Sequence, residues 1–196
     1  MTDQLSLSIW LDRNSRGSRL KHFEKLLRVF PFSQRPQPQS TISVQAVNAT
    51  EPPLLEQPLN GPIDAGEVIS IVREWTGDDV ACRVESWWDL WQFEEDWKLA
   101  PWRVVLSCIG PEFDDGSDPA VRQEDLRVDF GVDTWYLPQP ELAGGAKLVE
   151  SNIKSLLRLV HEIDSALPVE MRKLETESGE NFAERLQRAL VASRIQ

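Results

Sequence analysis

The stretch VACRVESWWDLWQFEEDWKLAPWRVVLSCI, residues 80–109, decides the fold. Its two ends, 80–88 and 102–109, are apolar runs of the kind that form β-strands. A third such run follows at 126–130, with a possible extension through 134–137. Because the connections between these runs are short, the pattern favours antiparallel pairing. The middle of the chain is therefore predicted to be a β-sheet.

The residues before this stretch predict two further strands and two helices. Residues 5–11 and 41–47 alternate apolar and polar side chains, which is typical of strands covered on one face. Between them, apolar residues recur at helical spacing from Leu20 to Phe30, and Pro31 ends the predicted helix. Four prolines in 51–62 indicate a surface loop, and a capping-box pattern at 64–67 begins a second helix over about 64–76.

The residues after the stretch predict two more helices. The apolar spacing over 151–167 is helical and Pro168 ends it, while 180–192 holds a last amphipathic helix. The chain is thus expected to be one α+β domain over 1–196, with element order β-α-β-α-β-β-β-α-α. We expect a roughly five-stranded, mixed or mainly antiparallel sheet with helices packed on one face.

The charge of the chain is concentrated in its middle. The net charge is −11, and residues 78–133 hold 15 acids against 5 bases. Six bases surround the first helix: Arg13, Arg16, Arg19, Lys21, Lys25 and Arg28. The acidic excess opposes general binding to nucleic acid, which lysine and arginine drive. The sequence has no apolar segment long enough for a membrane span and no signal peptide, so a cytoplasmic protein is expected.

The acidic middle also carries most of the tryptophans. Residues 87–102 contain five of the eight tryptophans, together with four acids. Because alternate side chains of a strand point to opposite faces, these rings cannot all face one core, and we expect at least one at the surface. An exposed tryptophan beside carboxylates suits a cationic partner. The candidate binding residues are Trp87, Trp88, Trp91, Glu94, Glu95, Asp96 and Trp97.

Two functions from different classes follow from this segment. The first is a non-enzymatic module that binds another protein or itself, with the basic first helix as a complementary surface for a homo-oligomer. The alternative is a protein or enzyme that binds a carbohydrate or another small polar ligand, with Glu94, Glu112 or Asp114 beside exposed tryptophans. A third possibility is a component of a larger assembly.

Metal and cofactor chemistry is not expected. The acids of the turn 112–118 lack the ligand spacing of a calcium loop, so the turn is interpreted as a solvated one. The two histidines, His22 and His161, have no second ligand at zinc spacing. The two cysteines, Cys82 and Cys108, lie inside apolar runs and are interpreted as small buried hydrophobic residues. Gly144-Gly145 is interpreted as a flexible hinge or as the approach to a helix rather than as a phosphate-binding turn.

Overall fold

A computed structural model describes residues 3–12, 14–116, 122–139, 142 and 144–193. It confirms the α+β class, with both helices and a large antiparallel sheet. The strands are β1 (Gln4–Leu11), β2 (Thr41–Ala46), β3 (Leu55–Pro58), β4 (Val80–Phe93), β5 (Trp97–Ile109), β6 (Leu126–Val132) and β7 (Val169–Thr176). The α-helices are α1 (Arg19–Val29), α2 (Ala65–Val72), α3 (Ala146–Ala166) and α4 (Phe182–Ser193), and the short 3₁₀ helices are η1 (Arg16–Ser18) and η2 (Asp133–Tyr136).

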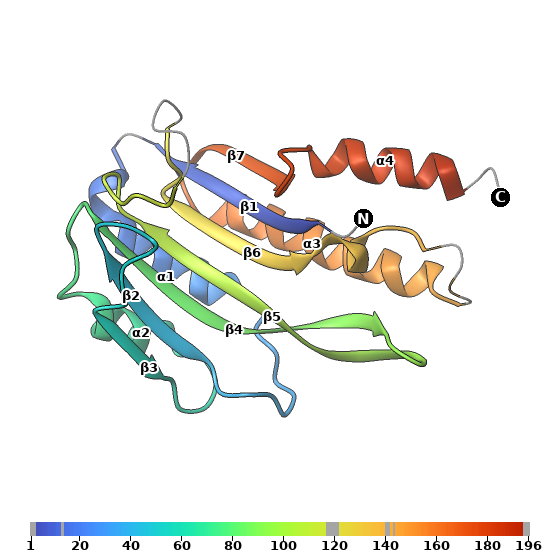
Figure 1. The fold of residues 1–196 in the computed structure, drawn as a ribbon, viewed down its shortest axis with the longest axis horizontal. Helices are drawn as coiled ribbons and strands as arrows, with labels where there is room; N and C mark the ends of the chain where they lie inside the picture. The colour runs from blue at the N-terminus through green and yellow to red at the C-terminus, as the bar shows by residue number, and fades with distance from the viewer. Residues whose placement is uncertain (1–2, 13, 117–121, 140–141, 143, 194–196) are drawn as a thin grey trace.

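The seven described strands form one twisted sheet in the order β3-β2-β4-β5-β6-β1-β7 (Figure 1). Every pairing between neighbouring strands is antiparallel. The long hairpin of β4 and β5 forms the centre of the sheet, and its far end projects beyond the other strands (Figure 1). The first strand of the chain, β1, inserts between β6 and β7 rather than beside β2.

The helices α1, α2 and α3 lie side by side behind the sheet and leave its other face uncovered by helices (Figure 1). The side chain of Asp64 caps α2 by accepting hydrogen bonds from the backbone N–H groups of Gly66 and Glu67, at 2.7 and 3.0 Å. Asn152 of α3 fastens that helix to β4: it accepts a hydrogen bond from the N–H of Trp91 and donates one to its carbonyl. This pair of hydrogen bonds fixes α3 to the central hairpin of the sheet.

The core fills the space between the helices and the sheet. The leucine and isoleucine side chains of β1 are fully buried there, as are Phe23 and Leu26 of α1. Trp88 is 4% exposed and lies within ring contact of Phe30, Phe130 and Tyr136. Burial of such large side chains supplies most of the stabilisation of a domain of this size.

Two strands exceed the predicted number, and both are edge strands. The short β3 lies in the proline-rich segment predicted to be a loop, and it pairs only with β2. An edge strand tolerates Pro58 because its outward side needs no hydrogen-bond donor. β7 begins directly after Pro168, so the proline that ends α3 also starts a strand. The predicted extension over 134–137 is instead mostly the short 3₁₀ helix η2.

The central strands are longer than predicted, because β4 continues to Phe93 and β5 already begins at Trp97. Pro101 lies within β5 opposite Asp89, in a strand that is central along part of its length. Its missing N–H is tolerated because the pairing of β5 with β6 extends only to Val105. The tryptophan-rich connection of the sequence is therefore a strand pair.

No helix in the described part of the chain is long and apolar enough to cross a membrane. Two charged residues considered in the sequence analysis lie outside the described residues: Arg13, before the first helix, and Asp118, at the end of the acidic turn 112–118.

Candidate functional site

The face of the sheet opposite the helices is polar, and one sequence pattern builds it. Three strands carry a cation, an aliphatic residue and an anion in succession: Arg83-Val84-Glu85, Arg127-Val128-Asp129 and Lys173-Leu174-Glu175. Because successive side chains of a strand point to opposite faces, each aliphatic residue enters the helix-side layer while both charges reach the open face. Val84 and Val128 are accordingly fully buried.

The register of the sheet aligns these charges into two rows that cross the strands. From β2 to β7, the first row, here called the basic row, is Ser43, Arg83, Ser107, Arg127, Ser8 and Lys173. The second row, here called the acidic row, is Thr41, Glu85, Val105, Asp129, Ser6 and Glu175. In each row, small residues alternate with the charged ones, so long side chains can lie across the sheet.

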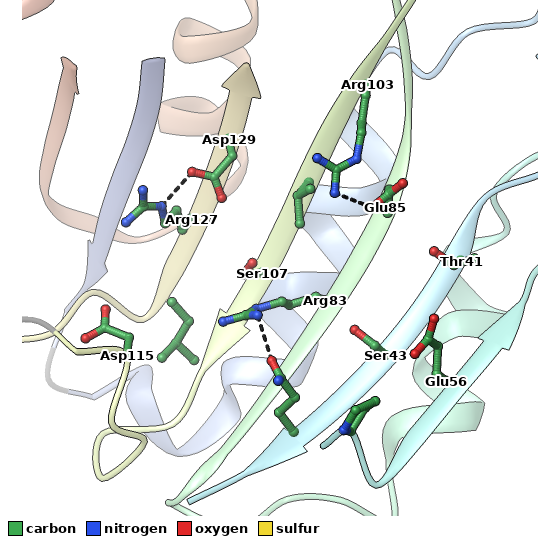
Figure 2. Close-up of a pocket in the computed structure, with 14 residues that line it drawn as sticks. Thr41, Ser43, Glu56, Arg83, Glu85, Arg103, Ser107, Asp115, Arg127 and Asp129 are labelled. Carbon is green, nitrogen blue, oxygen red and sulfur yellow. Dashed lines mark hydrogen bonds and ion pairs between the residues drawn. The ribbon is translucent and has the colours of Figure 1, made fainter. Parts of the chain in front are cut away.

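A hollow of about 550 Å³ lies over the part of these rows between β2 and β6 (Figure 2). Polar and charged side chains from β2, β3, β4, β5 and β6 line it, together with Asp115 of the loop after β5. Ile109 also lines the hollow, and it packs with Phe113 and Ala81 in a small apolar cluster. The hollow is therefore a broad and mainly polar depression.

Two arginines of the hollow are neutralised by carboxylates within the chain. Arg103 pairs with Glu85, and Arg127 donates from Nε to Asp129 at 2.7 Å (Figure 2). Burial opposes the charge of Arg127, but Asp129 and Glu124 outweigh this effect and hold its pKa above the ordinary value. The hydrogen bond from Arg103 to Glu85 likewise raises the pKa of Arg103. Both guanidinium groups are fixed cations.

Arg83 differs from these two arginines in its partners. Its Nη1 donates a hydrogen bond to the neutral amide oxygen Oε1 of Gln45 at 2.6 Å, and its guanidinium carbon lies 6.0 Å from the centre of the Phe113 ring. Among the described residues, no carboxylate forms an ion pair with it. Arg83 therefore places in the hollow a positioned guanidinium group that has no ion pair with a described carboxylate.

The tryptophans predicted to form a site do not share one surface. Trp88 lies in the helix-side core, whereas Trp87 and Trp91 lie on the opposite face of β4 and are partly buried. Trp97 packs against Phe93, with ring centres 5.5 Å apart, at the projecting end of the hairpin. Of the five tryptophans in 87–102, four are partly exposed and one is buried.

The three acids predicted beside these rings form the turn of the hairpin. Glu94, Glu95 and Asp96 are exposed. Glu94 pairs with Lys98, and Asp96 accepts a hydrogen bond from the backbone N–H of Trp97 at 2.7 Å. The predicted seven-residue site therefore comprises an acidic turn, three partly exposed tryptophans and one core tryptophan. Binding by this segment stays a prediction.

The other groups considered for chemistry also lie apart from the rows. Glu112 and Asp114 lie in the loop that carries Phe113, where Asp114 accepts a hydrogen bond from the N–H of Gly116. Within the described ranges, no group of three histidine, cysteine, aspartate or glutamate side chains is placed to hold a metal ion. Cys82 and Cys108 are opposite each other on β4 and β5, as free thiols, and burial raises the pKa of Cys82 to about 12.

We compared the chain with models of protein families, with characterised proteins and with solved structures, and found no match in any of the three. The function is therefore inferred from the geometry of the molecule itself.

Proposed function

We propose that this protein is a non-enzymatic protein-binding module and that its partner binds to the open polar face, on the basic and acidic rows. The observation that carries the proposal is the register, which aligns three cation–aliphatic–anion triplets from β4, β6 and β7. Each triplet places two charged side chains on a face that no helix covers (Figure 1). We also propose that the protein is located in the cytoplasm, as the sequence predicts.

The engagement of the carboxylates favours binding over catalysis. Glu85 and Asp129, the two acids of the acidic row within the hollow, each accept from an arginine. General acid–base catalysis needs a group that can reach a substrate proton, and paired catalytic carboxylates face each other across the reacting bond. In this hollow, Glu85 and Asp129 face cations on the protein.

The lining of the hollow favours a protein over a small molecule as the partner. Sites for small ligands are mostly apolar with a few polar groups, whereas this hollow is lined mainly by charged, hydroxyl and amide side chains. Protein interfaces are rich in arginine and tolerate such a polar surface. Rows of both signs also suit a partner surface of mixed charge, because complementary charges set the orientation of docking.

The shape of the face favours a different protein over a second copy. Two copies that met through this face would bring two hollows together, and each copy carries a net charge of −11. A protruding loop or helix of another protein fills a hollow better than a second hollow does. Self-association through the basic first helix remains the alternative within the same class.

Site-specific photo-cross-linking in the native cells tests this proposal. The photoreactive amino acid p-benzoylphenylalanine would replace Val105, at the centre of the open face, in the full chain. Matched variants would place it at Leu157, which is 55% exposed on α3, and at Glu95 in the hairpin turn. We expect one protein, identified by mass spectrometry, to be cross-linked from position 105 and not from position 157.

Other patterns would contradict the proposal in distinct ways. Cross-links from Glu95 alone would favour the acidic, tryptophan-rich hairpin as the binding site. An adduct of two identical chains would favour self-association. Adducts only from Leu157, or no adduct from position 105, would remove the open face as a partner-binding surface.

A further inference from the structure

We propose that Arg83 is the anchor of the open face and that it binds the carboxylate of an acidic side chain of the protein partner. The inference rests on the proposed function and names the chemical group recognised at its centre. It follows from the contrast between Arg83 and its two neighbouring arginines.

The contrast is one of charge balance on the same surface. Arg103 and Arg127 each pair with a carboxylate. Arg127 also pairs with a second one, because its Nη1 lies 3.4 Å from Oε1 of Glu124. Arg83 lies two strands from Arg127, at the same level of the sheet, and has a neutral amide instead. A guanidinium that is partly removed from water without a counter-charge gains more from an added carboxylate than one already paired.

The contacts of Arg83 prepare it for that carboxylate. Gln45 receives its hydrogen bond from Nη1, which leaves the parallel N–H donors of Nε and Nη2 for a two-point contact. The ring of Phe113 restricts water on one side, and Ser43 and Ser107 flank Arg83 on the neighbouring strands. Their hydroxyl groups are suitable donors for the remaining lone pairs of a bound carboxylate.

The surroundings of Arg83 select the class of anion. The hollow is lined by one more acid than arginine. The acids are Glu56 of β3, Glu85 of β4, Asp129 of β6 and Asp115 of the loop, and the arginines are Arg83, Arg103 and Arg127. A doubly charged phosphate would meet more repulsion from these acids than a singly charged carboxylate does. A single carboxylate on a partner that also carries cations matches both rows.

Nuclear magnetic resonance of the arginine side chains tests the anchor directly. The Nε–Hε resonances of the full chain would be followed while N-acetylglutamate α-methylamide is added, a probe whose only carboxylate is that of the side chain. We expect a saturable shift of the Arg83 resonance, with a dissociation constant in the millimolar range, roughly that of one or two weak contacts. Arg103 and Arg127 should shift at least about fivefold less, because their carboxylates compete with the probe.

Three further probes assign the source of the carboxylate. N-acetylglutamine carries only a terminal carboxylate, inorganic phosphate is the alternative anion, and N-acetylglutamine methylamide is the uncharged control. Stronger saturable binding of N-acetylglutamine would assign a chain terminus instead of a side chain, and stronger binding of phosphate would overturn the carboxylate. Equal and unsaturated shifts of all three arginines would overturn the anchor.

Variants separate this inference from the proposed function. Arg83→Gln should abolish the cross-link from position 105, Arg83→Lys should weaken it, and the exposed Arg103→Gln should weaken it less than Arg83→Gln does. A cross-link that persists unchanged in Arg83→Gln would show that the face binds the partner without this anchor. Probe binding at Arg83 without any cross-link from position 105 would instead overturn the proposed function and leave the carboxylate site intact.

Discussion

The ring of Tyr136 lies among other aromatic rings in the helix-side core. The centres of the Trp88, Phe130 and Phe182 rings lie 6.3–6.4 Å from that of Tyr136. The side chain is fully buried, and its oxygen has no hydrogen-bond partner among the described residues. Burial raises the pKa of Tyr136 well above its ordinary value, so the neutral phenol is the buried form.

We predict that Tyr136→Phe stabilises the protein. The substitution removes a buried polar group without a partner and keeps the ring, so the free energy of unfolding should rise by about 1–3 kcal/mol. Urea denaturation monitored by tryptophan fluorescence measures this change. Tyr136→Ala is the matched control, because the loss of the ring should destabilise the fold by about 3–5 kcal/mol. A loss of stability in Tyr136→Phe would mean that the hydroxyl has a partner.

At the scale of the element, Asn152 joins α3 to the central hairpin. Its side chain accepts from the N–H of Trp91 and donates to the carbonyl groups of Trp91 and Trp135, at 2.8–2.9 Å. The side chain is 2% exposed, so water cannot easily replace it. One residue thus satisfies backbone groups of β4 and of η2.

We predict that Asn152→Ala destabilises the protein by roughly 2–4 kcal/mol, because it leaves buried backbone groups without partners. Thermal and urea denaturation would measure the loss. Lys154→Ala on the same helix is the control: Lys154 is exposed and pairs with the exposed Glu150, so its loss should cost less than about 0.5 kcal/mol. Equal losses in the two variants would show that Asn152 does not fasten α3 to the hairpin.

The elements also show how far the sequence predicts the fold. Alternation in β1 and β2 and the apolar spacing of α1 and α3 follow from burial on one face, and they predicted the α+β class. The edge strands β3 and β7 were missed because proline marks a break along the chain, while an edge position tolerates that break. The start of α3 at Ala146 also precedes the predicted start at 151.

The sequence predicts the candidate site less well than it predicts the fold. The triplets at 83–85, 127–129 and 173–175 are visible in the sequence as cation, aliphatic residue and anion. Their alignment, however, depends on β1 entering between β6 and β7, and on a strand at 169–176, where the sequence predicts no element. Residues far apart in the chain share a row only through the sheet register, which a single sequence does not specify.

At the scale of the whole molecule, the two faces of the sheet have different roles. The helix-side face holds the core and positions the strands, while the open face displays alternating charge that contributes little to that core. The net charge of −11 opposes binding to nucleic acid, but the local balance of the rows suits a partner of mixed charge. The molecule thus combines a net negative charge with an open face on which the charges of the two rows are locally balanced.

The methyl resonances of Val105 test the open face most directly. Val105 lies between Glu85 and Asp129 in the acidic row, whereas Leu157 is exposed on α3 and Leu99 lies near the end of the hairpin. The protein recovered by cross-linking would be titrated into the full chain labelled at its methyl groups. We predict that the Val105 resonances shift in proportion to the bound fraction while those of Leu157 and Leu99 stay in place. Shifts confined to Leu99 or Leu157, with Val105 unchanged, would contradict binding at the open face.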